Sequence, residues 1–445
     1  MVFSAILLAA TLQTKVASVT KIYDRDYAKK LVPMLTEVIG FPTTQYDAEG
    51  HAAQKAWLAK TAHDLGLTYR DAGLISEIEL PGPPNAPILG LMVHGDVQPA
   101  EADAWSFAPY VGKADATYVY GRGSADDKGP LVQALLAMKA LKKSGIARTH
   151  TVRLLVGSDE ESANTDVAEY LKTHQPPDYT LVIDSEFPVV AGEKAWNSLS
   201  LTTDAKSERP GISTPYTVPF IEAGLSTSIV PDRAEVKLEW KGDTAPDWQA
   251  VIDAAKSAKL PPDTRLATQA INTTLRVVAY GHSSHAGVNI ESGRNALVAL
   301  SRALDGLLPT GGANDLLAFV RTAGTDIYGT GLGITDNDPL WGRYAVNIAT
   351  IKPTLDDPKL STMTINIRRT PPRTGPQLKA KMDELVAAFN QRTGASLVPG
   401  GFYGDEPLAF DPNSKIVRRL LADYAAATGT KNPKPAISGG GTYAK

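Results

Sequence analysis

The sequence predicts an α/β fold, in which a mainly parallel mixed sheet is flanked by helices and an α+β domain is inserted. Three observations support this prediction. Helical and apolar strand segments alternate between residues 131 and 183, as they do in βαβ units. Several buried-type strands end in a histidine or an acid. After Trp196 the pattern changes to strands with polar alternation, which indicates a second structural unit.

Composition limits the class of protein. A chain of 445 residues exceeds one ordinary core, so two domains are expected. The net charge of −3 favours neither nucleic acid nor an acidic membrane surface as a partner. The chain has no cysteine, which excludes thiol nucleophiles, thiolate metal ligands and disulfides.

The N-terminal segment Val2–Leu12 is apolar enough for the core of a signal peptide. It lacks a basic start and a clean cleavage site, and it is too short to span a bilayer. The alternative is a short amphipathic lead-in to the first helix. Cytoplasmic and periplasmic locations therefore both stay open.

Apolar spacing and turn residues predict the elements of the first domain in order. Helices are expected at residues 26–39, 51–65, 131–144, 166–174 and 414–427, and strands at 75–80, 88–94, 151–157 and 180–183. In the inserted domain, strands are expected at 197–203, 225–240, 273–280, 344–352 and 360–368, and helices at 248–258, 293–307 and 378–392. The predicted domains are 21–195 and 400–445 for the first, and 196–399 for the insertion.

The segment Val119–Pro130, VYGRGSADDKGP, places Asp126 and Asp127 between glycines where a strand turns into a helix. Glycine permits backbone angles that other residues avoid, and paired carboxylates hold divalent cations. A solvated turn is the alternative for this segment alone.

Other strand ends supply further ligand types. His94 ends an apolar strand with Asp96 two residues on, Glu160 and Glu161 follow the next, and Asp184 follows another. Residues i and i+2 share a face of a strand, so Asp96 can accept a hydrogen bond from the imidazole and fix its tautomer. Because ligands bind at the carboxyl ends of strands in open α/β sheets, the sequence predicts a divalent metal site there.

These motifs resemble the dizinc metallopeptidase family of bacterial dipeptidase PepV, carnosinase, aminoacylase and succinyl-diaminopimelate desuccinylase. The resemblance covers nearly the whole chain, and the segments Asp184–Trp196 and Gly439–Lys445 are most similar to PepV-type dipeptidases. It implies a zinc-peptidase catalytic domain with a lid insertion and a small peptide substrate, with neither nucleic acid nor membrane as partner. A monomer, or a homodimer formed through the lid domain, is expected.

The resemblance also implies two Zn²⁺ ions, with Mn²⁺ or Co²⁺ as alternatives. Asp126 would bridge them, His94 and Asp184 would bind one, and Glu161 would bind the other. The family places a last metal-binding histidine after the GGGTYA motif, but no histidine follows His285 here. We therefore expect a truncated form of a longer protein; a second site that is weak or filled otherwise is the alternative.

Catalytic and substrate-binding roles follow from the same resemblance. Glu160 would be the general base that takes a proton from a metal-bridged water, while Asp96 would act through the imidazole. His285, in the loop GHSSHAG, matches the lid histidine that stabilises the oxyanion. Asp127 would support its turn.

Three further residues are expected to bind substrate. Arg368 matches the arginine that binds the substrate carboxylate, and Gly439 and Gly440 lie in the glycine-rich tail. From the residues alone, a solvated histidine at position 285 and a surface salt bridge at Arg368 are the alternatives.

The expected activity is metal-dependent hydrolysis of short peptides, above all dipeptides. An N-acyl-amino-acid amidohydrolase or a carboxypeptidase of the same family is one alternative. A non-catalytic peptide-binding relative is the other, and the missing histidine supports it. In that case, or if the chain is truncated, the chain would be inactive.

Overall fold

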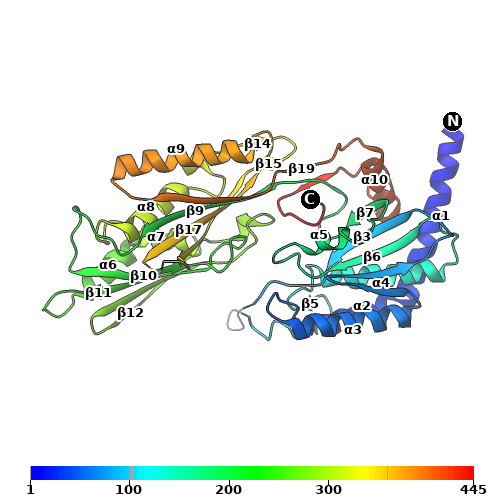
Figure 1. Ribbon diagram of the computed structural model, residues 1–445, viewed down its shortest axis with the longest axis horizontal. Coiled ribbons are helices and arrows are strands. Elements are labelled where there is room, and N and C mark those ends of the chain that lie inside the picture. The colour runs from blue at the N-terminus through cyan, green and yellow to red at the C-terminus, as the bar shows by residue number, and fades with distance from the viewer. Residues whose placement is uncertain (1, 101–104, 358) are drawn as a thin grey trace. The chain divides into compact units, whose positions relative to one another are not determined.

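A computed structural model describes residues 2–100, 105–357 and 359–445, which form two compact units (Figure 1). The first unit runs to Val190 and takes in Asp411–Ala436 and Thr442–Lys445. The second unit comprises Ala191–Phe410 and Ile437–Gly441. The domain boundaries predicted from the sequence, after residues 195 and 399, stay predictions.

The first unit is built on a five-stranded sheet with the order β1-β2-β6-β3-β7. Its strands are β1 (Thr68–Ala72), β2 (Ile75–Leu80), β3 (Ile88–His94), β6 (Thr151–Gly157) and β7 (Tyr179–Val182). Strand β3 pairs in parallel with β6 and β7, whereas β2 is antiparallel to β1 and β6. Four of the five strands therefore point the same way, as the sequence predicted for a mainly parallel mixed sheet.

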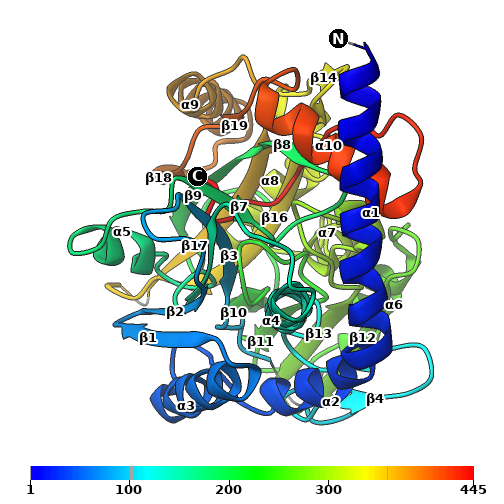
Figure 2. The same cartoon turned by 90° about the vertical axis from the view of Figure 1, so that its right-hand side faces the viewer.

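Helices cover both faces of this sheet, because consecutive residues of its central strands are apolar and point to opposite faces. They are α1 (Val2–Asp26), α2 (Ala28–Ile39), α3 (Ala48–Leu65), α4 (Lys128–Lys143), α5 (Asp166–Leu171) and α10 (Lys415–Thr428); the hairpin β4 (Lys113–Ala114) and β5 (Val119–Tyr120) precedes α4. On β3, Val93 joins the core formed with α2, α3 and α4, while Met92 faces Tyr170 of α5. Helix α1 packs beside α4 and α10 (Figure 2).

The second unit contains an eight-stranded sheet with the order β12-β13-β11-β10-β16-β17-β9-β18, in which the paired strands are antiparallel. The strands are β9 (Ala195–Asp204), β10 (Tyr216–Ala223), β11 (Arg233–Trp240), β12 (Arg265–Ile271), β13 (Thr274–Tyr280), β16 (Ala345–Pro353), β17 (Leu360–Arg369) and β18 (Val398–Gly404). The helices α6 (Trp248–Ser257), α7 (Ala296–Ala303), α8 (Gly312–Ala323) and α9 (Gly375–Thr393) pack on it through one hydrophobic cluster. Short elements complete the chain: β8 (Val190–Glu193), β14 (Asn337–Asp338), β15 (Gly342–Arg343), β19 (Leu408–Ala409), β20 (Ala436–Ser438), η2 (Ile290–Ser292) and η3 (Thr330–Leu332).

One predicted strand of the second unit is too long. The sequence predicts a strand over 225–240, but β11 begins at Arg233. The preceding segment is a loop because the Asn347 side-chain amide donates to the backbone oxygens of Thr227 and Ile229, which removes them from a sheet ladder. This loop carries Ser228, which contacts the candidate substrate site described below.

Among the described residues, none of the helices combines the length and the apolar character needed to cross a lipid bilayer.

Candidate metal centre

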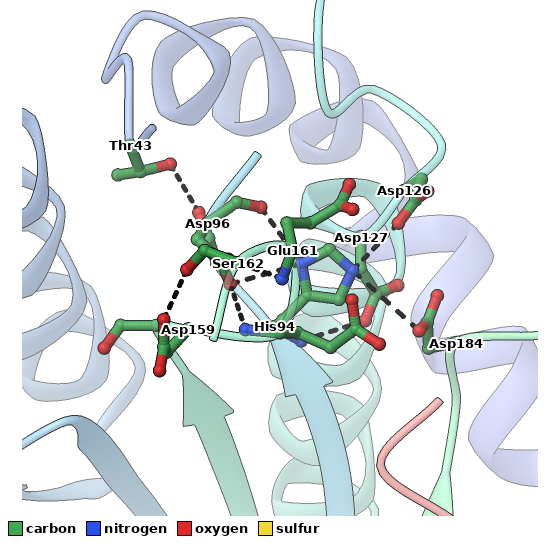
Figure 3. Close-up of polar contacts among 12 residues, drawn as sticks. Thr43, His94, Asp96, Asp126, Asp127, Asp159, Glu161, Ser162 and Asp184 are labelled. Carbon is green, nitrogen blue, oxygen red and sulfur yellow. Dashed lines mark hydrogen bonds and ion pairs between the residues drawn. The ribbon is translucent and has the colours of Figure 1, made fainter. Parts of the chain in front are cut away.

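His94 stands at the carboxyl end of β3 with its side chain almost fully buried. Its Nδ1 lies 3.0 Å from the backbone oxygen of Asp96, which can only accept, so Nδ1 donates this hydrogen bond. The other ring nitrogen, Nε2, lies 2.8 Å from Asp126 Oδ1 and 3.8 Å from Asp184 Oδ2 (Figure 3). The imidazole thus turns Nε2, the nitrogen that a metal would use, toward two carboxylates.

Two groups of side chains in the described part of the chain could hold a metal ion. One comprises His94, Asp126 and Glu161, the other His94, Asp127 and Asp184, and within each group the ligand atoms lie within 4.8 Å of one another. The structure therefore brings all four predicted ligands together, and it adds Asp127.

Asp127, which was expected only to support its turn, also lies among the candidate ligands. Its Oδ2 accepts a hydrogen bond of 3.2 Å from the backbone N–H of His94, which supports the end of β3. Its Oδ1 is buried and has no hydrogen-bond partner among the described residues. A buried carboxylate oxygen without a partner is costly unless a cation or a donor is present, so this atom fits a metal ligand.

The electrostatics of the cluster favour a cation. Burial and the charge of Asp184 raise the pKa of Asp127 to about 9. Burial, together with the neighbouring carboxylates, raises the pKa of Glu160 to about 8 and raises that of Glu161. Burial disfavours a charged imidazole, but hydrogen bonds to Asp126 and Asp96 outweigh it and raise the pKa of His94. A divalent cation would compensate the carboxylates that crowd this site.

The carboxylate of Asp96 holds the turn that carries the two glutamates. Its oxygens accept hydrogen bonds from the backbone N–H groups of Glu160, at 3.2 Å, and Glu161, at 2.9 Å. The carboxylate lies 3.5 Å from His94 Nδ1, farther than the backbone oxygen of the same residue. Gln98 Nε2 also donates to the Glu161 carboxylate at 3.0 Å. Asp96 therefore supports both the imidazole and the glutamate turn.

Thr43, a residue that the sequence analysis did not single out, fastens the loop after β3. Its hydroxyl donates to the Gly95 oxygen at 2.6 Å, and its own backbone oxygen accepts from the Val97 N–H at 3.0 Å (Figure 3). The buried ammonium of Lys128 donates to the backbone oxygen of Phe41 at 2.6 Å. The segment between α2 and α3 is thereby tied both to α4 and to the loop that follows His94.

In the second unit, Arg368 is buried, with 3% of its surface exposed. Its guanidinium donates to Asn366 Oδ1 at 3.0 Å, to Ser228 Oγ at 3.1 Å and to the Gly439 backbone oxygen at 3.3 Å. None of the described residues forms an ion pair with it, and burial lowers the pKa of Arg368 to about 10. Gly440 follows in the same tail, where its N–H donates to the Ser438 hydroxyl at 3.0 Å. Ser228 carries no signal in the local sequence that marks it as a contact of Arg368.

Arg369, the next residue, points to the other face of β17 and forms an ion pair of 2.7 Å with Glu406. Arg369 is fully buried, so the surface salt bridge considered for Arg368 is formed by neither arginine in the described part of the chain.

The His285 ring has a defined tautomer. Its Nδ1 accepts hydrogen bonds from the backbone N–H groups of Gly287, at 3.2 Å, and Val288, at 3.1 Å. In the neutral ring the proton is therefore on Nε2, which is then a donor. A Cβ at Gly287 would lie 2.2 Å from the Gly439 backbone oxygen and 3.1 Å from Arg368 Cζ, so only glycine allows this close packing. The histidine loop, the glycine tail and the arginine thus form one cluster within the second unit.

Comparison with known proteins identifies the class. The sequence profile of peptidase family M20/M25/M40 matches residues 90–445, so the chain belongs to this family of metallopeptidases. The beta-Ala-Xaa dipeptidase of Lactobacillus delbrueckii subsp. lactis is 27% identical over 366 residues, which cover 80% of this chain and 72% of that protein. The predicted family is therefore confirmed.

Two solved structures are similar in fold. Human carnosine dipeptidase 1 has a TM-score of 0.55 at 16% identity, covering 96% of this chain and 87% of that chain. The di-peptidase Dug1p from Saccharomyces cerevisiae has a TM-score of 0.53 at 14% identity, covering 97% and 86%. The predicted α/β architecture with catalytic and lid domains is confirmed.

Proposed function

We propose that the protein is a metal-dependent dipeptidase. One observation carries the proposal: a buried imidazole nitrogen and four carboxylates, from Asp126, Asp127, Glu161 and Asp184, converge at the carboxyl edge of a mainly parallel sheet, with Glu160 in the same turn as Glu161. The beta-Ala-Xaa dipeptidase that resembles this chain supports the choice of dipeptides over other substrates of the family.

The donor set fits zinc, which accepts nitrogen and oxygen ligands, with Mn²⁺ or Co²⁺ as alternatives. His94, Asp127 and Asp184 would hold one cation and Glu161 would hold a second, while Asp126, which lies 2.8 Å from His94 Nε2, is the proposed bridge between the two. Cations bound there would polarise the scissile carbonyl and lower the pKa of the attacking water. The ligand group with Glu161 includes Asp126, whose side chain is 68% exposed, so the cation held there is expected to bind more weakly.

Glu160 is the proposed general base. It belongs to neither ligand group, yet it is held in the same turn as Glu161 by the carboxylate of Asp96. Burial raises the pKa of Glu160 above its ordinary value, and a raised pKa suits a carboxyl group that must accept a proton and then return it. In this role it takes a proton from the attacking water and delivers it to the leaving amine.

The cluster in the second unit is the proposed substrate-binding site. Arg368 is a buried guanidinium without an ion pair among the described residues, and a substrate carboxylate would provide the missing charge. Ser228, Gly439 and Gly440 would line the same place. The Nε2–H of His285 would donate to the substrate oxygen as negative charge develops on it.

Blocking the substrate carboxylate tests this assignment. The wild type should hydrolyse a free dipeptide with a kcat/KM at least about 30-fold higher than that for the same dipeptide amide, because truncating a buried charge pair costs 2 kcal/mol or more. Arg368→Met should remove this preference by lowering only the value for the free dipeptide. An unchanged preference in Arg368→Met would show that another residue binds the carboxylate.

The same assay separates the alternatives. A dipeptidase should hydrolyse the free dipeptide faster than an N-acetyl amino acid or a tripeptide of matching side chains. Preference for the N-acetyl compound would make the protein an amidohydrolase, and preference for the tripeptide a carboxypeptidase. Tight binding of all three without turnover would favour the peptide-binding relative.

A further inference from the structure

The loop after β6 carries Glu160 and Glu161, and its first residues are held by a single carboxylate. Asp166, the first residue of α5, is fully buried. Its Oδ2 accepts hydrogen bonds from the backbone N–H groups of Ser158, at 2.8 Å, and Asp159, at 3.2 Å. These two residues directly precede Glu160, so the position of Asp166 sets the path along which the loop approaches the metal ligands.

Asp166 is in turn held by a residue from the far end of the chain. The hydroxyl of Tyr443 donates to the same oxygen, Oδ2, at 2.5 Å. Both residues belong to the first unit, and the Tyr443 ring packs on the small cluster that includes Met92 and Leu155. A Cβ at Gly157 would lie 2.1 Å from the Tyr443 hydroxyl, so the glycine at the end of β6 makes room for this contact.

The Tyr443 hydroxyl matters because the other donors to the Asp166 carboxylate are backbone N–H groups. None of the described residues forms an ion pair with Asp166, and burial raises its pKa. Apart from backbone N–H groups, the donor that holds this carboxylate is therefore the Tyr443 hydroxyl. Hydrogen bonds to ionised acceptors are short and strong, and losing one inside the protein leaves the carboxylate free to shift.

We propose that Tyr443 is a positioning residue for catalysis: through Asp166 it fixes the loop that presents Glu160 and Glu161 to the reaction centre. The inference rests on the proposed role of Glu160 as general base. The proposal assigns a role to Tyr443 of the tail motif GGGTYAK, which takes no part in the metal binding or substrate binding proposed above.

Tyr170 provides a matched control. It packs in the same cluster as Tyr443, and its hydroxyl also lies 2.5 Å from a buried carboxylate oxygen, Glu77 Oε1. Glu77 stands within β2 and also accepts from Arg70 at 2.7 Å, so this second contact ties the other end of α5 to the sheet and does not involve the backbone of the glutamate loop. Phenylalanine in place of either tyrosine removes one hydroxyl and keeps the ring.

The test compares Tyr443→Phe with Tyr170→Phe and the wild type, with two readouts. In hydrogen exchange, Tyr443→Phe should speed the exchange of the Ser158 and Asp159 amides, whereas Tyr170→Phe should leave it unchanged. In dipeptide hydrolysis at saturating zinc, Tyr443→Phe should lower kcat about 10- to 100-fold with little change in KM, because small misplacements of a catalytic group are costly. Tyr170→Phe should keep the wild-type kcat.

Equal exchange at these amides in all three proteins would overturn the proposal, whatever the activity. A wild-type kcat for Tyr443→Phe would also overturn it. Faster exchange in Tyr443→Phe, combined with full turnover in a Glu160→Gln variant, would instead retain Tyr443 as the anchor of the loop and reject Glu160 as the base. The two claims thus fail separately.

Discussion

Glu160→Gln is expected to lower kcat for dipeptide hydrolysis by about 10³- to 10⁴-fold, at the upper end of what a positioned general base contributes. Glutamine keeps the size of the side chain but cannot accept the proton. Metal content should stay near that of the wild type, because Glu160 belongs to neither ligand group among the described residues. Steady-state kinetics and elemental analysis of the same preparation measure both quantities.

Glu161→Gln is the matched control, since the two residues are neighbours in one turn and Asp96 holds both backbone N–H groups. In Glu161→Gln the affinity for the metal should fall, and the activity should recover at high metal concentration. Loss of metal together with retained turnover in Glu160→Gln would reverse the two roles.

His285→Ala is expected to lower kcat by about 10²- to 10³-fold, the typical cost of removing one oxyanion donor. The effect on KM should be small, because the charge on the substrate oxygen develops only in the transition state. The structure supports this role because Gly287 and Val288 hold Nδ1 and leave the proton on Nε2.

His282→Ala controls for the general effect of a substitution in this loop. His282 lies in the same GHSSHAG segment, is exposed, and its backbone pairs with Arg294. It should retain the wild-type kcat. An unchanged kcat in His285→Ala would show that His285 is a solvated loop histidine without a role in catalysis.

Much of the first unit could be predicted from sequence because its strands are short apolar runs bounded by turns. Strands β2, β3 and β6 occupy the predicted residues. The second unit was harder, and β10, β12 and α8 were missed. Strand β10 contains Pro219 and its register shifts beside that residue. Edge strand β12 is largely exposed and lacks an apolar pattern. Helix α8 begins at Gly312, directly after Gly311, and two successive glycines favour a loop prediction.

The candidate ligands His94 and Asp184 could be proposed from local patterns, because the ends of parallel strands meet at one edge of the sheet. The residues that support the site could not. The hydroxyl of Thr43 reaches Gly95 across 52 positions of the sequence, and that of Ser228 reaches Arg368 across 140. Such contacts depend on the packing of distant segments, and nothing in the local sequence marks them.

Zinc titration of the metal-depleted protein, with bound metal and dipeptide hydrolysis measured together, tests the central claim most directly. We predict no hydrolysis without metal. One zinc ion should bind tightly, and hydrolysis should appear as a second zinc ion binds with lower affinity. The same titration on a reading frame extended past Lys445 tests whether a further histidine tightens the binding of the second ion. Hydrolysis that persists after metal depletion, or zinc binding without dipeptide hydrolysis in both forms, would contradict the account.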